Sequence, residues 1–96
     1  MEIPDKIKIC GKTYKVDIRN NRGIKDGADR GASASNWSQI IWIDDDQHIE
    51  TQEESLLHEI IELILKEVDF EYIHSMVSTL SLILYQVLKE NNFLKD

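Results

Sequence analysis

The spacing of apolar residues changes once along this chain, at about residue 51, from every second position to every third or fourth. Alternation with a period of two is typical of a β-strand with one buried face, whereas steps of three and four are typical of an amphipathic helix. A chain of 96 residues supports one modest hydrophobic core. The sequence therefore predicts a single α+β domain over residues 1–96, with a small antiparallel three-stranded sheet at about 6–43 followed by two packed helices.

The first two strands are predicted within residues 6–18, where alternate positions are apolar and a glycine-containing turn, Cys10-Gly11-Lys12-Thr13, divides the two runs. The apolar positions are Ile7, Ile9, Tyr14, Val16 and Ile18. A third strand is predicted at residues 38–43, and the three aspartates after it are interpreted as a solvated strand exit, because they lack the spacing and glycine of a calcium loop. Residues 19–36 hold three glycines and few apolar residues, which predicts a long mobile loop.

Two amphipathic helices are predicted in the second half of the chain, at about 52–68 and 71–90, with a break at residues 69–70. Thr51 and Glu54 have the spacing of a capping box at the start of the first helix. Each helix carries a wide apolar stripe that it cannot bury alone. We therefore expect the helices to pack against each other and against the sheet.

Net charge and composition indicate which kinds of partner the chain can bind and in which compartment it is expected. The net charge is -7, so phosphate backbones would be repelled and nucleic-acid binding is not expected, whereas a protein or peptide partner is. The single cysteine, Cys10, allows no internal disulfide. The N-terminus has no signal-peptide pattern, and the apolar stretches carry charges that would keep them out of a membrane. We expect a cytoplasmic protein.

The stretch SLLHEIIELILKE, residues 55–67, contains a candidate metal site. Residues four apart on a helix lie about 6 Å from each other, so His58 and Glu62 can converge on one point. Zinc accepts imidazole nitrogen and carboxylate oxygen, and a catalytic zinc site uses three protein ligands and a water molecule. His74, near the start of the second helix, is the candidate third ligand, and Glu59 stands where a general base would accept a proton from that water. Non-haem iron uses the same ligand set.

A purely structural interpretation of these residues stays open. Glu59, Glu62 and Lys66 fall at helical steps, and Glu62–Lys66 is an ordinary surface pair. His58 can equally be a histidine at the edge of the core that is hydrogen-bonded to the backbone, and His74 an exposed one. The pattern His-Glu-x-x-Glu is weak evidence for a metal when it stands alone.

The order of motifs resembles that of the short metallopeptidase-like proteins of phages and mobile elements, which belong to the ImmA/IrrE-like, zincin-type class. Four runs carry the resemblance, in this order: GKTYKV, QIIWID, ETQEESLLHEII and LYQVLKENNF. It spans Ile7 to Phe93 apart from the glycine-rich loop, and LLHEII and LYQVLKEN are its most specific pieces. It implies a minidomain of one sheet and two helices, with zinc held by the motif helix and by a carboxylate near the start of the next helix. A phage-encoded member would act in the host cytoplasm.

By this resemblance His58 matches the first zinc ligand and Glu59 the catalytic base. Glu62 stands where the family has its second histidine, and the family's acidic ligand falls at about His74-Ser75. The two departures are complementary. An exchange of ligands would preserve two histidines and one carboxylate, whereas two independent losses would mark decay of the site. Glu71 is an alternative third ligand one turn earlier.

In zincins an edge strand beside the motif helix holds an extended substrate by main-chain pairing. Residues 38–43 are the candidate strand, with Ile41 and Trp42 as candidate substrate contacts and residues 19–36 as a candidate lid. Three functions stay open: a metallopeptidase-like domain that binds zinc, a non-catalytic acidic module that binds a host protein as an inhibitor or regulator, and a homodimer formed through the apolar second helix. Metal occupancy separates the first function from the second.

Overall fold

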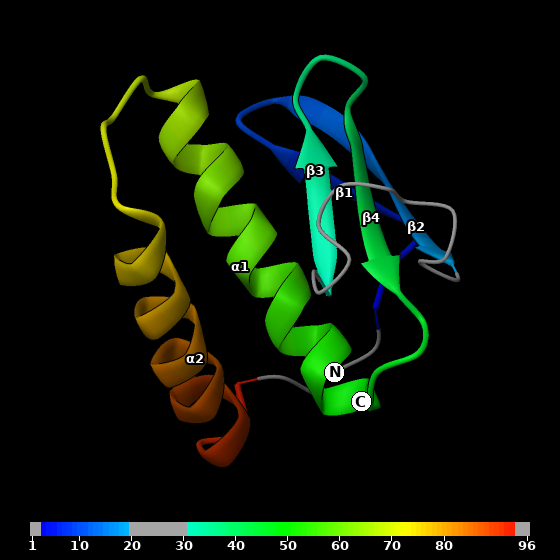
Figure 1. Ribbon diagram of the computed structural model, residues 1–96, viewed down its shortest axis with the longest axis vertical. Coiled ribbons are helices and arrows are strands. Elements are labelled where there is room, and N and C mark those ends of the chain that lie inside the picture. The colour runs from blue at the N-terminus through cyan, green and yellow to red at the C-terminus, as the bar shows by residue number, and fades with distance from the viewer. Residues whose placement is uncertain (1–2, 20–30, 94–96) are drawn as a thin grey trace.

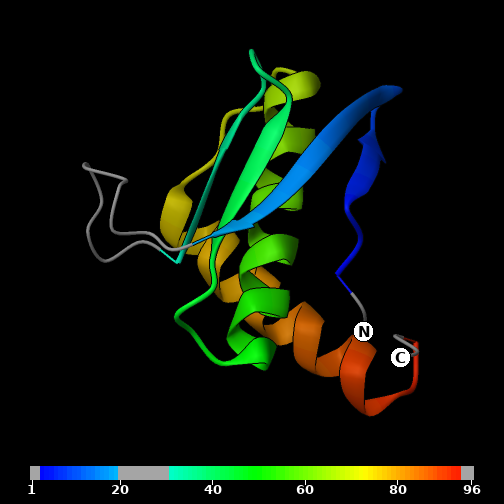
Figure 2. The ribbon, with the colours of Figure 1, turned by 90° about the vertical axis from the view of Figure 1, so that its right-hand side faces the viewer.

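The computed structural model describes residues 3–19 and 31–93 as one sheet with two helices on one of its sides (Figure 1). The elements are β1 (Lys6–Ile9), β2 (Lys12–Arg19), β3 (Ala32–Ser35), β4 (Ile40–Asp44), α1 (Ile49–Glu67) and α2 (His74–Glu90). Figure 2 looks onto the outer face of the sheet, with both helices behind it. No described element covers that outer face. The predicted α+β class is confirmed.

The sheet is mixed, with the strand order β1-β2-β4-β3. β1 pairs with β2, and β3 with β4, in the antiparallel sense, whereas β2 and β4 run parallel with Lys15 opposite Ile40. The prediction of three antiparallel strands is therefore wrong in detail. The physical reason is β3, which reverses the chain once more between β2 and β4, so that β4 runs in the same direction as β2.

The turn between β1 and β2 is confirmed and consists of two residues, Cys10 and Gly11, since Ile9 pairs directly with Lys12. Both turn residues have positive φ, 51° and 83°. This is the conformation of a type I′ turn, whose twist matches that of the flanking strands. Glycine adopts it without a steric penalty, and Cys10 does not.

Helix α1 begins earlier than expected. His48 is its N-cap, and the imidazole Nδ1 of His48 accepts a hydrogen bond from the backbone N–H of Glu50 at 3.2 Å. The predicted capping box is wrong, because Thr51 lies inside the helix and Glu54 accepts a hydrogen bond from the Ser81 hydroxyl of α2 at 2.9 Å. The predicted break after α1 is confirmed, since Asp69, with φ of 56°, follows the C-cap.

The hydrophobic core lies between the sheet and α1. It consists of Ile9, Tyr14, Val16, Ile41, Ile43, Leu56 and Leu63. Helix α2 packs against α1 rather than against the sheet, with Val77 and Ser81 fully buried. The expectation that both helices cover the sheet therefore holds for α1 alone, and one side of α2 is left facing solvent.

The predicted loop at 19–36 is partly wrong, because residues 32–35 form β3. Residues 20–30, which make up most of the predicted lid at 19–36, lie outside the described residues. The start of β3 is held to the end of β4, since the Gly31 carbonyl accepts hydrogen bonds from the Asp44 N–H at 2.9 Å and from the Gln47 side chain at 2.8 Å. Within the described ranges, neither helix is long and apolar enough to cross a membrane.

Candidate metal centre

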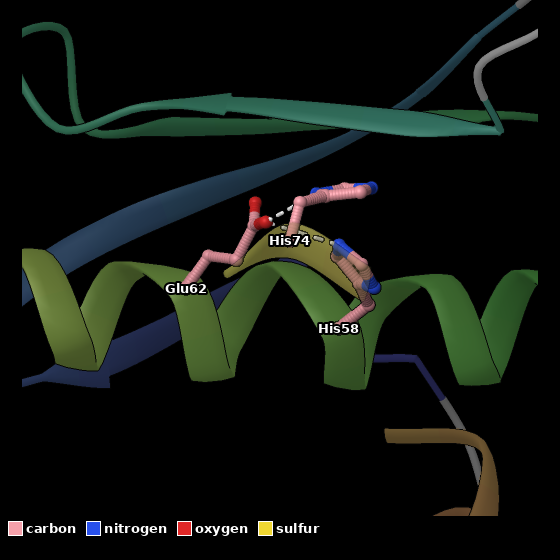
Figure 3. A group of neighbouring side chains, drawn as sticks. All are labelled: His58, Glu62 and His74. Atoms are coloured by element: carbon pink, nitrogen blue, oxygen red, sulfur yellow. Dashed lines mark hydrogen bonds and ion pairs between the residues drawn. The ribbon is translucent and has the colours of Figure 1, made fainter. Parts of the chain in front are cut away.

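The three side chains predicted to bind a metal point toward one another on one side of α1 (Figure 3). Glu62 Oε2 lies 3.3 Å from His58 Nε2 and 2.8 Å from His74 Nδ1. One ligand atom from each residue lies within 4.8 Å of the other two. Among residues 3–19 and 31–93, this is the one group of three or more His, Cys, Asp or Glu side chains that is gathered closely enough to share a metal ion.

Helix geometry and tertiary packing each contribute part of this cluster. His58 and Glu62 are one turn apart on α1, so the helix itself brings them together. His74 is the first residue of α2 and comes into place because Val77, which is fully buried, sets the first turn of α2 against α1. The Ile73 carbonyl accepts hydrogen bonds from the N–H groups of Met76 and Val77 and so begins the helix at this point. The imidazole rings of His58 and His74 lie with their centroids 4.8 Å apart.

Burial differs sharply among the three candidate ligands. The side chains of His58 and Glu62 are 12% and 15% exposed, whereas that of His74 is 71% exposed. His58 Nε2 is closed to solvent and has no hydrogen-bond partner among the described residues. Glu62 Oε2 is near enough to attract it, at 3.3 Å, but the two groups are not oriented as a hydrogen bond. A buried polar atom without a partner costs roughly 1–3 kcal/mol, and a metal ion that accepted the Nε2 lone pair would relieve this cost.

Two of the three separations in the cluster are close to those around a metal ion. Bonds of about 2.0–2.2 Å in a tetrahedral zinc site place neighbouring ligand atoms roughly 3.3 Å apart. The two distances to Glu62 Oε2, 3.3 and 2.8 Å, are close to that spacing, whereas the two imidazole nitrogens, which lie within 4.8 Å of each other, would have to approach to share one ion. The exposed side of His74 leaves the cluster open to solvent, and an open position is what distinguishes a catalytic zinc site from a structural one.

Two further ionisable groups neighbour the cluster in the chain, Glu59 directly after His58 and Tyr72 two residues before His74. Glu59, the predicted base, is buried on the same helical face as Leu56 and Leu63, which pack against the sheet. Burial, and then the negative charges of Glu62 and Glu59, raise the pKa of Tyr72. The Tyr72 phenol therefore keeps its proton at neutral pH. No sequence motif identifies Tyr72. Only its position, two residues before His74, could have pointed to it.

The predicted substrate contacts are not brought to the cluster. Ile41 is fully buried in the core, and Trp42 alternates with it and lies on the outer face of the sheet. The prediction that residues 38–43 form an edge strand is wrong, because β4 lies between β2 and β3. Of the two edge strands, β1 and β3, it is β3 that makes the more extensive contact with α1. The alternative ligand Glu71 is exposed and is not a member of the cluster.

Comparisons of this chain with protein-family models, with curated proteins and with solved structures give no match. The candidate metal centre is therefore interpreted from the chain's own residues, through the convergence of His58, Glu62 and His74 in the fold.

Proposed function

We propose that this chain is a zincin-like metallopeptidase domain of the kind found in phages and mobile elements, that it holds zinc through His58, Glu62 and His74, and that it acts on peptides in the cytoplasm. The observation that carries the proposal is the arrival of His74, from a separate helix, beside a buried His58 nitrogen that lacks a hydrogen-bond partner. The resulting set of two histidines and one carboxylate is that of many zinc hydrolases. The two departures from the family motif thus compensate for each other.

Bound at this position, zinc would act as a Lewis acid and lower the pKa of a water molecule. Glu59, next to His58 in the chain, would be the residue to accept a proton from such a water. The protonated phenol of Tyr72 is a hydrogen-bond donor for negative charge that develops on the substrate. β3 is paired on one side only, so its free edge offers main-chain N–H and C=O groups to an extended peptide. In this proposal β3 takes the role that the sequence suggested for residues 38–43.

The first test is the metal content of protein purified without a histidine tag or chelator, followed by a zinc titration monitored by thermal unfolding. Zinc at 100 times its dissociation constant stabilises a folded protein by about 2.7 kcal/mol. For a domain of this size, that free energy corresponds to a rise in melting temperature of roughly 10–20 °C. Wild-type protein should carry one metal ion per chain and show this shift.

Variants of two carboxylates make the titration specific. Glu62→Ala removes a ligand and should abolish the shift at the same zinc concentration. Glu71→Ala removes an exposed carboxylate outside the cluster and should leave the shift unchanged. An equal effect of both variants would indicate nonspecific binding of zinc by an acidic surface. No bound metal and no shift in wild-type protein would reject the enzyme and favour the non-catalytic acidic module that binds a host protein.

Activity is tested separately from metal binding. If the wild type hydrolyses peptides in the presence of zinc, Glu59→Gln should retain the zinc-induced rise in melting temperature and lose the hydrolysis. Because glutamine keeps the shape of the side chain but cannot accept a proton, this pair of readouts separates the base from the ligands. Hydrolysis that survives in Glu59→Gln would contradict the assigned role.

A further inference from the structure

Helix α2 carries an apolar stripe that no described element covers. The stripe consists of Ile73, Met76, Leu80, Ile83 and Val87, whose exposure ranges from 39% to 68%. The steps between them alternate three, four, three, four. This is the a/d spacing of a helix that packs along its length against another helix. We call these five residues the α2 seam.

The α2 seam is separate from the face that α2 presents to α1. That inner face contains Val77 and Ser81, which are fully buried, and Leu84 and Leu88, which are partly buried. At about 100° per residue, the two stripes are centred roughly a quarter turn apart around the helix. α2 therefore has two apolar faces, and α1 covers one of them.

The composition of α2 shows that the seam is not adapted to water. Residues 72–88 contain no Asp, Glu, Lys or Arg, although 30% of the chain is charged. A helix at the surface of a globular protein normally carries charged residues on the face opposite its packed one. Here the exposed positions that flank the seam include Thr79 and Gln86, which are neutral.

We propose that the α2 seam is the interface of a homodimer, in which α2 of one copy packs antiparallel against α2 of a second copy. This inference is independent of the metal site. At the observed exposures the five side chains present roughly 500 Å² per chain, so a symmetric pair would bury about 1,000 Å², the area at which a specific interface begins. A second copy is therefore large enough to cover the seam.

Charge favours a second copy over a foreign partner. A basic partner would be recognised by acidic residues along the rim, but the exposed positions of α2 beside the seam, Thr79 and Gln86, are neutral, and Glu90 lies only at its C-terminal end. Two copies of a chain with a net charge of -7 repel each other, and the repulsion at the contact is smallest where the contacting surface lacks charged residues, as residues 72–88 do.

The orientation follows from Glu90, which continues the spacing of the seam by one step after Val87. In a parallel pair, Glu90 of one chain would face Glu90 of the other, which is a like-charge contact. In an antiparallel pair it lies near the first turn of the partner's α2. That turn has no acidic residue, and its N-cap, Ile73, provides no side-chain hydrogen bond. A carboxylate is stabilised at a helix N-terminus.

The test is the mass of the protein in solution, measured by sedimentation over roughly two orders of magnitude in concentration. Wild type should pass from the chain mass of 11.2 kDa to twice that value. Leu80→Glu places a charge at the centre of the seam and should raise the dimer dissociation constant by about 100-fold or more. Leu82→Glu is the matched control, because Leu82 is 59% exposed on the same helix but lies off the seam, and it should dimerise like wild type.

A wild type that stays monomeric at every concentration, or equal disruption by Leu82→Glu and Leu80→Glu, would overturn the proposal. Circular dichroism should show that both variants keep the helical content of the wild type, since both side chains are solvent-exposed in the monomer. Orientation is tested with Ile73→Cys and Val87→Cys, each combined with Cys10→Ser. A disulfide that forms with a chemical oxidant only when the two chains are mixed supports the antiparallel pair. Self-linking of either chain alone would rule it out.

Discussion

Replacing Tyr85 with phenylalanine should weaken the contact between the two helices. The Tyr85 hydroxyl donates a hydrogen bond to the Glu53 carboxylate, which is buried on α1 and also lies 3.4 Å from the Lys89 ammonium. Phenylalanine keeps the ring and removes one donor from a buried charge, which costs about 1–3 kcal/mol. At 4–8 °C per kcal/mol, the melting temperature of a domain of this size should fall by roughly 5–20 °C.

The loss should depend on pH. Burial is the largest influence on the Glu53 carboxyl and raises its pKa, but the Tyr85 hydrogen bond and the Lys89 charge outweigh it, so the folded-state pKa is lowered. A lowered pKa stabilises the fold above the unfolded-state value of about 4.3, and this stability is lost as pH falls through the folded-state pKa. The difference between wild type and Tyr85→Phe should thus be full at pH 7 and shrink below about pH 4.

Chemical denaturation followed by circular dichroism at neutral and acidic pH, at one protein concentration, measures both effects. Gln86→Ala is the control, because it removes an exposed hydrogen bond to Glu90 from the next residue of the same helix and should change stability by less than about 0.5 kcal/mol. A Tyr85→Phe variant as stable as this control, or a loss that is the same at both pH values, would refute the assigned role of Glu53.

Four further substitutions, two in the turn and two in α1, test the turn and the core by the same denaturation experiment. Gly11→Ala should cost about 1–2 kcal/mol, because φ there is +83° and the new Cβ meets no atom within 4 Å, so the penalty is purely conformational. Cys10→Asn should be neutral or stabilising, since Asn-Gly favours a type I′ turn, and a loss would contradict that assignment. Leu63→Ala should cost about 2–5 kcal/mol because Leu63 is fully buried between α1 and the sheet. Ile64→Ala, at an exposed neighbour, should cost less, and equal losses would place the core elsewhere.

The long periodic segments of the fold could be predicted from the sequence, and the short pairing-dependent ones could not. Helical steps located both helices to within three residues at each end, and alternation located the first hairpin. β3 has the sequence Ala-Ser-Ala-Ser, with no large apolar residue to show a period. It is a strand because it pairs with β4, and Ala32 and Ala34 pack against the core. Missing β3 also led to the wrong direction for β4.

For the candidate site too, one part could be predicted from the sequence and the other could not. Spacing on one helix was enough to bring His58 and Glu62 together. The position of His74 depends on how α2 packs against α1 through Val77, and a repeat along one helix does not determine its rotation against another. The burial of His58 Nε2 and the proximity of Tyr72 to two carboxylates are tertiary properties, so no local pattern could reveal them.

The parallel pairing of β2 with β4 bears on the order in which the chain folds. Antiparallel neighbours joined by short connections, such as β1–β2 and α1–α2, close small loops and can form early. β2 can meet β4 only after the chain between them has closed a much longer loop, and contacts of that kind slow folding. His58, Glu62 and His74 all belong to the helical hairpin. We therefore expect the candidate metal cluster to assemble ahead of the sheet, with the folding rate limited by the docking of β4.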